Sequence, residues 1–337
     1  MNILIIGAGG FIGSHLSEQI LKNHQQWKIF AIDIASDKIK HLLADDNFNF
    51  FNINILTSMP LVEEILAKSD VVLPLAAIAN PSVYVKNPLA VFELDFEANL
   101  AIVKLVAKYQ KRLIFPSTSE VYGLCSDEKF EEETSYCVTG PVCKQRWIYS
   151  ASKQLLDRVI YAHGVRDSLS YTLFRPFNFI GSRLDDIFNA SYGSSRVITQ
   201  FLSNIYHGND INLVDGGGQM RCFIDIDDAV EAILRIIENE NGCAEQQIFN
   251  IGNPGNLWTI RELAHIMVDM AKKYDKLADS ANKITVRNVN SREYYGDSYQ
   301  DVSRRVPAIK RAQELLQWTP KISLEESLKK IMDFYFS

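Results

Sequence analysis

The chain has 337 residues, of which 47% are hydrophobic, and its formal net charge is -6. This length can hold one large two-lobed domain or two domains, and an acidic chain without a basic tract argues against a nucleic-acid partner. The 5 cysteines stand at irregular spacing without a CxxC pair, which favours a reducing compartment and argues against disulfides and a zinc site. We therefore expect no metal.

An apolar segment begins at residue 2, which leaves no room for a signal peptide ahead of it. No apolar run approaches the ~20 residues that a membrane span needs. The sequence thus predicts a cytoplasmic protein without a membrane partner.

The first thirty-three residues carry the clearest pattern. A short apolar strand at 2–6 runs into a glycine turn at 7–13, a helical pattern follows from Phe11 to about Leu21, and a second strand at 29–32 ends in Asp33. This order of strand, glycine turn, helix, strand and acidic residue is typical of a dinucleotide-binding unit. An acid ~20 residues after the turn accepts hydrogen bonds from a ribose 2′-OH and would repel a 2′-phosphate, so we expect NAD rather than NADP.

Each part of this unit has a physical task. Gly7 permits a tight turn, Gly10 lets the backbone approach a pyrophosphate, and Gly13 lets the helix pack on the sheet. The helix N-terminus supplies N–H groups and a partial positive charge for the phosphates. The residues expected to bind the cofactor here are Gly7, Gly10, Phe11, Ile12, Gly13 and Asp33.

Strand and helix patterns then alternate along the chain. We expect strands at 48–53, 70–75, 113–115 and 171–174, and helices at 61–68, 88–109 and 147–164, the last of which closes on a glycine. Strands separated by helices of this length form a parallel, doubly wound sheet of the Rossmann type. Such a sheet binds its ligands at the carboxyl ends of the strands.

The regular alternation of strand and helix patterns ends after residue 175. Short strands at 211–214 and 222–226 alternate with loops rich in Gly and Asn, and helical patterns follow at 229–238, 260–271, 309–316 and 324–335. A strand at 247–251 has the character of one more sheet strand. We therefore expect an NAD-binding domain over 1–175, joined by that strand, and a smaller substrate lobe over 176–337 that is interleaved with it.

Two segments carry candidate chemistry. Hydroxyl groups follow the strand at 113–115, where Ser117 or Thr118 could hydrogen-bond an alcohol oxygen. Tyr149 and Lys153 stand four residues apart on a helix and so share a face. A phenol with a pKa near 10 is a poor base, but a neighbouring ammonium and a positive nicotinamide favour its anion. This makes Tyr149 a candidate base for an alcohol that gives up a hydride.

These motifs resemble the extended short-chain dehydrogenase/reductase family, whose members act on nucleotide sugars through transient oxidation at C4. The pattern narrows to the UDP-glucuronate decarboxylase domain of the bifunctional polymyxin-resistance enzyme, without that enzyme's formyltransferase domain. The segments that carry this narrower resemblance are PSTSEVYG at 116–123, RWIYS at 146–150, KQLLDR at 153–158, FRPFN at 174–178, YYG at 294–296 and YQDV at 299–302.

The resemblance implies NAD-dependent oxidative decarboxylation of UDP-glucuronate to UDP-4-keto-pentose, CO2 and NADH, within lipopolysaccharide modification. It gives catalytic roles to Tyr149, Lys153, Thr118, Glu120 and Arg305. By motif position Glu120 would be the acid/base residue and Arg305 the proton donor. A guanidinium hardly ever loses its proton, so Arg305 is better suited to bind the C6 carboxylate and stabilise enolate charge. The choice of Arg305 over Arg304 depends only on how the family's motif aligns with this sequence.

The resemblance also implies contacts with both ligands. The residues implied for the UDP-sugar are Ala79, Tyr84, Thr118, Ser119, Arg146, Asn178, the loop 212–221 with Arg221, and Tyr299. Those implied for the cofactor include Asn54, Ile55, Tyr149 and Lys153. Asn54 stands where the family usually has Asp, and Asn212, Gly218 and Met220 stand where the resembled enzyme carries lysines. From its glycines alone, the segment 215–221 could equally be an ordinary hairpin turn.

Other functions share the same residues. UDP-xylose synthase returns the hydride to C4, and the sequence does not separate it from the oxidative reaction. A 4,6-dehydratase is disfavoured because Ser119 replaces an acid, whereas a C4 epimerase remains open. A non-catalytic dinucleotide-binding regulator would commonly lose the pair that Tyr149 and Lys153 form.

Family analogy further implies a homodimer. The apolar faces of the expected helices 88–109 and 147–164 could pair with their copies in a helix bundle, or could simply cover the sheet.

Overall fold

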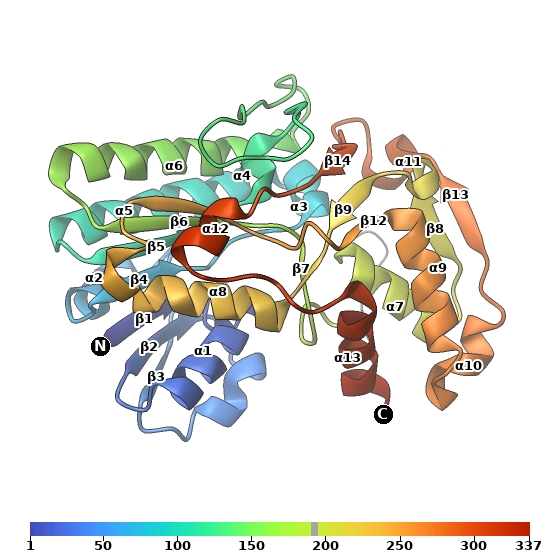
Figure 1. Cartoon of the computed structure of the whole chain (residues 1–337), viewed down its shortest axis with the longest axis horizontal. Coiled ribbons are helices and arrows are strands. Elements are labelled where there is room, and N and C mark those ends of the chain that lie inside the picture. The colour runs from blue at the N-terminus through green and yellow to red at the C-terminus, as the bar shows by residue number, and fades with distance from the viewer. Residues whose placement is uncertain (190–194) are drawn as a thin grey trace.

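The computed structural model describes residues 1–189 and 195–337. Within these residues, seven strands form one parallel sheet in the order β11-β6-β5-β4-β1-β2-β3 (Figure 1). The strands are β1 (Asn2–Ile6), β2 (Lys28–Asp33), β3 (Phe48–Asn52), β4 (Val71–Pro74), β5 (Arg112–Pro116), β6 (Tyr171–Pro176) and β11 (Gln247–Ile251). This is the expected Rossmann-type fold. The strand order reverses between β1 and β4, which is where such a sheet binds its ligand.

Helices cover both faces of the sheet (Figure 1). Alternate residues of β1 point to opposite faces, so Ile3 and Ile5 join one hydrophobic core while Leu4 and Ile6 join the other. The first core is closed by α1 (Phe11–Asn23), α8 (Ile226–Glu238) and α12 (Lys310–Leu315). The second core is closed by α2 (Met59–Ala67), α5 (Asn99–Lys108) and α6 (Trp147–Asp167).

Most of the chain after β6 forms a smaller lobe, at the right of Figure 1. Its helices are α7 (Val197–His207), α9 (Ile260–Ala271), α10 (Asp275–Ala281), α11 (Ser291–Tyr295) and α13 (Leu324–Phe336). Its strands form small sheets from β8 (Ile211–Val214) with β13 (Val286–Val289), from β9 (Met220–Cys222) with β12 (Leu257–Thr259) and β14 (Arg304–Arg305), and from β7 (Phe179–Ile180) with β10 (Ile224–Asp225). A third hydrophobic core fills this lobe.

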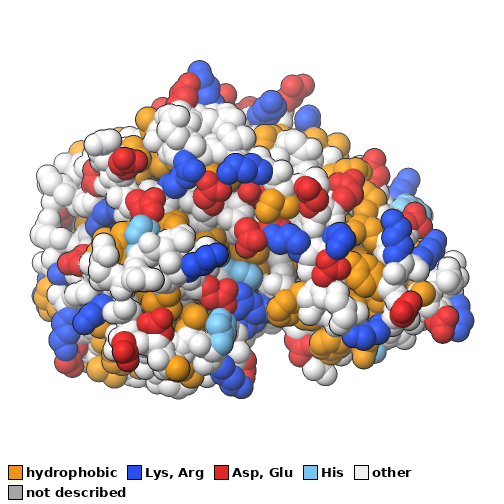
Figure 2. Space-filling model, turned by 60° about the horizontal axis from the view of Figure 1, so that its bottom comes forward, with side chains coloured by type: hydrophobic (Ala, Val, Ile, Leu, Met, Phe, Trp, Pro, Cys, Tyr) orange, Lys and Arg blue, Asp and Glu red, His pale blue; other side chains and the backbone are white. Residues whose placement is uncertain are grey.

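β11 returns from the lobe to the main sheet, where Gln247–Ile251 pairs in parallel with β6 from Thr172 to Pro176. The segment thus forms the additional sheet strand that its pattern predicts. On the face shown in Figure 2, acidic and basic side chains are interspersed. Within the described residues, none of the helices combines the length and the apolarity needed to cross a lipid bilayer.

Three expected elements differ from the structure. α6 does not close at Gly164: it runs on to Asp167 and ends at Ser168 in the left-handed conformation. The expected helix 88–109 comprises α4 (Pro88–Phe92), a π-helical segment (Glu93–Ala98) and α5. The expected strand at 222–226 is split between β9 and β10, and β10 ends at Asp225 because this residue caps α8 and accepts a hydrogen bond from the Asp227 N–H at 2.9 Å.

Candidate active site

The glycine turn between β1 and α1 forms a close-packed cradle. Gly7 has φ +92°, and a Cβ on it would lie 2.6 Å from the Ala76 nitrogen. A Cβ on Gly13 would lie 2.4 Å from the Gly7 oxygen, so this glycine lets α1 approach the turn. At Gly10 the Gly7 oxygen, at 3.1 Å, is the nearest neighbour among the described residues. The turn is therefore tightly packed at its base and open at Gly10.

The start of α1 and the end of β2 complete this cradle. Among the described residues, no side chain caps α1, so its first N–H groups remain free to bind an anion. The Asp33 carboxylate accepts hydrogen bonds from the backbone N–H of Gly9 at 2.8 Å and of Ala35 at 3.1 Å. An anion site with an acid beside it fits the diphosphate and ribose of NAD.

The two residues expected at the adenosine end follow β3. Asn54 is exposed, and its side-chain oxygen accepts a hydrogen bond from the Leu56 N–H at 3.0 Å. Ile55 is buried in the core beneath α2 and α5.

The predicted catalytic pair lies on α6. The Lys153 ammonium donates a hydrogen bond to the Pro116 carbonyl oxygen at 2.9 Å, at the carboxyl end of β5. Tyr149 shares a hydrogen bond with Thr118 and stacks on Tyr84, with 4.8 Å between the ring centroids. All four side chains are buried. α6 thus brings the phenol and the ammonium to the sheet edge where ligands bind.

Burial dominates the protonation of this pair. It raises the pKa of Tyr149 well above the usual range of a phenol, and the negative charge of Asp95 adds to the effect. Burial also lowers the pKa of Lys153, which the carboxylates of Asp95 and Asp157 oppose. A phenolate at Tyr149 therefore requires a further positive charge beside it.

Ser117 and Thr118, both candidates from the sequence, have different surroundings. Ser117 donates a hydrogen bond to the Asp157 carboxylate at 2.8 Å, which also pairs with Arg175 at 3.3 Å. Thr118 is the hydroxyl that contacts Tyr149, and its oxygen accepts the Glu120 N–H at 3.2 Å. The structure thus places Ser117 in a supporting network and Thr118 beside the phenol.

Glu120 binds two arginines. Its carboxylate pairs with Arg146 at 2.5 Å and with Arg305 at 2.6 Å, and the two arginines are 1% and 8% exposed. Burial alone would raise the pKa of Glu120, but the charges of Arg146 and Arg305 hold it well below the usual range of a carboxyl. Glu120 is therefore an anion at neutral pH and a poor proton donor.

The strand β14 distinguishes Arg305 from Arg304. It pairs in parallel with β9, so that Arg304 lies opposite Met220 and Arg305 opposite Arg221. Because neighbouring residues of a strand point to opposite sides, Arg304 is exposed whereas Arg305 is buried against Glu120. The side chain that reaches the site is the one that the motif register favours.

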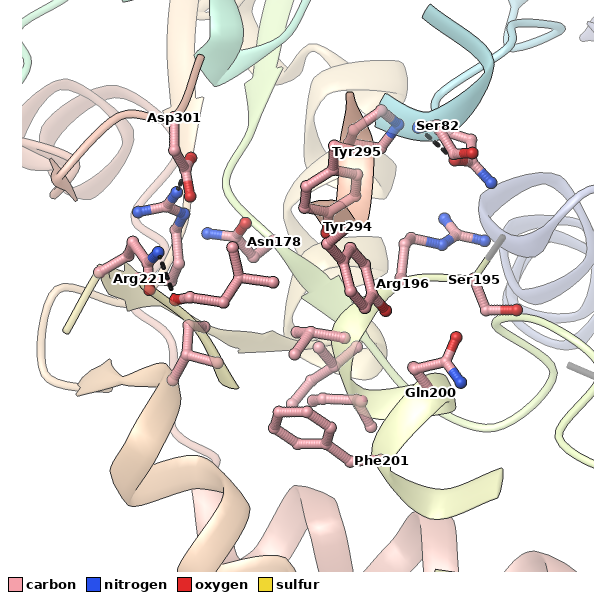
Figure 3. Close-up of a pocket in the computed structure, with 18 of the residues that line it drawn as sticks. Ser82, Asn178, Ser195, Arg196, Gln200, Phe201, Arg221, Tyr294, Tyr295 and Asp301 are labelled. Atoms are coloured by element: carbon pink, nitrogen blue, oxygen red, sulfur yellow. Dashed lines mark hydrogen bonds and ion pairs between the residues drawn. The ribbon is translucent and has the colours of Figure 1, made fainter. Parts of the chain in front are cut away.

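A pocket opens beside these groups, between the sheet and the lobe (Figure 3). In Figure 3, Arg221 and Asp301 lie on one side, Ser82 and Arg196 lie on the other, and Phe201 lies below. Among the described residues, its lining includes four arginines but two carboxylates. Of the residues expected to bind the substrate, Arg146, Asn178, Arg221 and Tyr299 line the pocket. Glu120 and Arg305, which are expected to act in catalysis, line it too. Other expected residues lie elsewhere: Tyr84, Thr118 and Ser119 are buried, and Ala79 is exposed in the loop after β4.

The segment 212–221, which ends on Arg221 in β9, is not a hairpin. β8 pairs with β13, whereas β9 pairs with β12 and β14, so the loop joins two different sheets. Arg221 ends buried in the pocket, where it pairs with Asp301 at 2.6 Å. Of the positions that lack the resembled enzyme's lysines, Asn212 lines the pocket, whereas a Cβ on Gly218 would meet nothing within 4 Å among the described residues.

Some lining residues were not predicted from the sequence. Arg196 pairs with Asp185 at 2.6 Å and lies over the Phe11 ring at 5.8 Å, between the glycine turn and the pocket. Tyr294 and Tyr295 line the pocket, and Tyr295 stacks on Tyr299 at 4.1 Å. Tyr294 and Tyr295 stand in the YYG segment, so the sequence offered a signal for them. For Arg196 the available signal is a lone arginine just before an amphipathic helix.

Residues 3–252 match the NAD dependent epimerase/dehydratase family, and the chain belongs to this family of enzymes. The fold, the open glycine cradle and the acid at the end of β2 agree with its NAD cofactor.

Known structures support this placement. The chain is 46% identical to the PbgP3 protein from Burkholderia pseudomallei, covering 99% of this chain and 96% of that one at a TM-score of 0.90. UDP-glucose 4-epimerase from Thermotoga maritima, solved with UDP-glucose, is 24% identical and covers 99% and 98% at a TM-score of 0.80. The dTDP-glucose 4,6-dehydratase from Bacillus anthracis, solved with NAD, is 22% identical and covers 99% and 96%, also at 0.80. The last two share the fold.

Proposed function

We propose that this enzyme catalyses the NAD-dependent oxidative decarboxylation of UDP-glucuronate to UDP-4-keto-pentose, CO2 and NADH. The observation that carries the proposal is the excess of arginine over carboxylate in the pocket, with two arginines at its catalytic end. Arg146 and Arg305 both bind Glu120, which follows Thr118 by two residues, and Thr118 contacts Tyr149. A sugar whose C4 hydroxyl reaches Tyr149 would therefore place its C6 substituent near guanidinium groups, which favour a carboxylate.

The chemistry begins at the C4 hydroxyl. The glycine turn and Asp33 would hold NAD, which would supply the acceptor for the C4 hydride. Tyr149 takes the hydroxyl proton, Thr118 holds the same oxygen, and the Lys153 ammonium favours the phenolate. C4 becomes a ketone β to the C6 carboxylate. The C5–C6 bond then breaks, CO2 leaves, and the bonding electrons move onto the C4 oxygen as an enolate. A proton returned to C5 completes the keto-pentose.

Arg305 serves the carboxylate step. We assign it to bind the C6 carboxylate and then to stabilise the enolate, because a guanidinium keeps its proton. Arg221, Asn178 and Tyr299, which line the pocket, would bind the UDP-sugar, together with Arg146, Ala79, Tyr84 and Ser119. Glu120, as an anion, is poorly suited to protonate a leaving hydroxide, which disfavours a 4,6-dehydratase.

Incubation of the enzyme with UDP-glucuronate and NAD tests the proposal. We expect one NADH, followed by its absorbance, and one CO2 for each UDP-4-keto-pentose formed. Tyr149→Phe should lower kcat by about 10²- to 10⁴-fold, whereas Tyr136→Phe, in a loop and 79% exposed, should leave it unchanged. UDP-xylose without net NADH would identify the redox-neutral reaction instead. Absence of turnover by enzyme that binds NAD, or full activity of Tyr149→Phe, would overturn the proposal.

We also propose that the enzyme is a homodimer that pairs through α6 and its neighbour α5. Both helices already bury one face against the sheet, through Ile102, Val106, Leu156 and Ile160. α6 nevertheless presents further apolar side chains to solvent, which a second copy would cover.

A further inference from the structure

Asp95 lies in the π-helical segment Glu93–Ala98, and its side chain is 0% exposed. The segment interrupts an otherwise α-helical stretch between α4 and α5, and it packs against α6, the helix of Tyr149 and Lys153. Single-turn π segments occur frequently at functional sites, and a fully buried carboxylate is rare unless it has a partner. Neither the sequence motifs nor the proposed chemistry gives this residue a role.

The contacts of Asp95 fix it in place. Its Oδ2 accepts a hydrogen bond from the Ile78 N–H at 3.0 Å, in the loop after β4. Nearby, the Asn99 amide donates to the Leu94 carbonyl oxygen at 2.9 Å and reaches the Ala76 oxygen at 3.5 Å. The π segment is thus tied to the loop that leads to the pocket. The second oxygen of Asp95, Oδ1, is buried and accepts no hydrogen bond from the residues that the structure describes.

The charged and titratable groups around Asp95 belong to the candidate active site. Lys153, on α6, is the cation whose charge favours the Asp95 carboxylate. Two phenols, Tyr149 on α6 and Tyr84 on α3 (Pro81–Lys86), are disfavoured as anions by that carboxylate. On its own segment, the neighbouring acids Glu93 and Glu97 are exposed.

Other charged groups also act on Tyr149 and Lys153, and they contribute to the pH dependence of both residues. Asp157, one turn further along α6, faces Lys153 together with Asp95. Glu120 and Arg196 act on Tyr149 with opposite signs, and Thr118 shares its hydrogen bond. Asp95 stands out because it acts on both members of the pair at once.

We propose that Asp95 is a positioning residue whose buried carboxylate holds the loop after β4 and sets the pH range in which Tyr149 and Lys153 work. This inference rests on the proposed function, because it takes the two residues as the catalytic pair. A negative charge disfavours the phenolate and favours the ammonium. Its removal should therefore make both groups more acidic and should move both limbs of the pH–rate profile in the same direction.

The protonation of Asp95 itself supports this role. Burial raises its pKa to about 6, against the opposing charge of Lys153 and the Ile78 N–H. Asp95 is therefore largely ionised at pH 7 and neutral in mildly acidic solution. The negative charge that Asp95 presents to Tyr149 and Lys153 therefore changes across this pH range.

Asp95→Asn tests the proposal, because the amide oxygen can still accept the Ile78 N–H. In kcat/KM against pH, we expect the acidic and the basic limb both to move to lower pH by about one unit. Glu97→Gln removes the same charge from an exposed position of the same segment and should leave the profile unchanged. Limbs that stay in place, or that move in opposite directions, would overturn the inference.

Thermal unfolding without substrate gives a readout that does not depend on turnover. The folded-state pKa of Asp95 lies above the ~3.9 of an unfolded aspartate. Asp95 therefore contributes stability below about pH 4 that is lost as the pH rises to about 6. Asp95→Asn does not lose it, so its Tm relative to the unmodified enzyme should rise over this interval and then level off. A constant Tm difference would contradict a buried, ionising Asp95.

The two measurements separate the possible failures. If Tyr149→Phe retains full activity, the proposed function fails, while the unfolding comparison still decides whether Asp95 ionises in the fold. If Tyr149→Phe is inactive and the Asp95→Asn limbs do not move, the inference alone fails. Asp95→Ser, which is also neutral and smaller, replaces Asp95→Asn in both measurements if the amide variant does not fold.

Discussion

Arg304 and Arg305 are adjacent in the sequence and have the same side chain, yet they occupy different environments. β14 exposes Arg304 and buries Arg305, with its guanidinium 2.6 Å from Glu120. Arg305 follows Glu120 by 185 positions in the sequence, so no local pattern could reveal this contact. The alternation of side chains along a strand distinguishes the two arginines, but it could be used only once the strand and its neighbour β9 were known.

Arg305→Met should therefore impair catalysis, and Arg304→Met should not. Met keeps most of the length of the side chain but removes the charge and the hydrogen bonds, so the carboxylate and the enolate lose their partner. We expect kcat/KM for UDP-glucuronate to fall by about 10²- to 10³-fold in Arg305→Met. Steady-state kinetics of both variants, with Tm measured alongside, check this. Equal effects of the two substitutions would contradict the assignment.

Asp95 shows the limit of sequence reasoning at this scale. Tyr149 and Lys153 were found because their spacing has a chemical meaning and a family pattern. Asp95 stands in a segment that was read as part of one amphipathic helix, in which an acid belongs to the solvated face. In the structure Asp95 lies four residues after the buried Val91 and is itself 0% exposed, in a segment that is π-helical rather than α-helical. An irregularity of one residue per turn leaves no periodic signal.

Among the elements, the glycine turn contains one glycine that close packing requires and one that leaves open space beside the turn. A Cβ on Gly13 would meet backbone at 2.4 Å, so this position is closed by the protein itself. A Cβ on Gly10 would meet the Gly7 oxygen at 3.1 Å and otherwise point into the open side of the cradle. The sequence pattern predicted both roles, because the fingerprint encodes backbone geometry.

Gly10→Ala and Gly13→Ala should consequently differ. Gly13→Ala forces backbone atoms apart, and overpacking of this kind costs about 1–3 kcal/mol, so its free energy of unfolding should fall. Gly10→Ala should change that free energy little but should weaken NAD binding at least about tenfold, because the methyl group occupies space close to the diphosphate. Denaturant unfolding and titration with NAD, monitored by protein fluorescence, measure the two effects. Unchanged NAD affinity in Gly10→Ala would show that the cofactor does not approach this residue.

Helix ends were predicted less well than helix starts. Gly164 suggested the end of α6, but a Cβ there would lie 2.4 Å from the Tyr171 ring, so this glycine provides room for a side chain of β6. The helix ends four residues later at Ser168, with φ 54°. A glycine near a helix end can either make room for a close contact or adopt a positive φ that ends the helix; here Gly164 does the first, and Ser168 does the second. Only the neighbouring strand shows which role applies.

At the scale of the whole molecule, the pocket depends on two parts that are distant in sequence. Glu120 and Arg146 come from the sheet edge and the start of α6, whereas Arg221 and Arg305 come from the lobe. The alternating pattern predicted the sheet because each strand and helix is a local element. It did not predict how β9 and β14 join in one small sheet, because two short strands pair through contacts that span most of the lobe.

The outer face of α6 carries exposed apolar side chains, which the proposed dimer would cover. Leu155, Tyr161 and Val165 are 49%, 57% and 73% exposed, at spacings of six and four residues along the helix. The sequence left two uses for the apolar residues of this helix. The structure shows that Leu156 and Ile160 cover the sheet, whereas Leu155, Tyr161 and Val165 face solvent. A second copy of the chain, related by a two-fold axis, is the partner proposed above.

Val165→Glu should then convert the dimer into a monomer. In the proposed dimer the carboxylate would be buried in the apolar contact between the two copies. An unpaired charge buried in an apolar interface costs several kcal/mol, so we expect the dimer dissociation constant to rise at least about 10²-fold. Leu315→Glu makes the same kind of change on α12, which covers the opposite face of the sheet and is 39% exposed at this residue, and should leave the assembly intact. Sedimentation of the three proteins over a range of concentrations distinguishes the outcomes, and a Val165→Glu variant that sediments like the unmodified enzyme would place the dimer contact elsewhere.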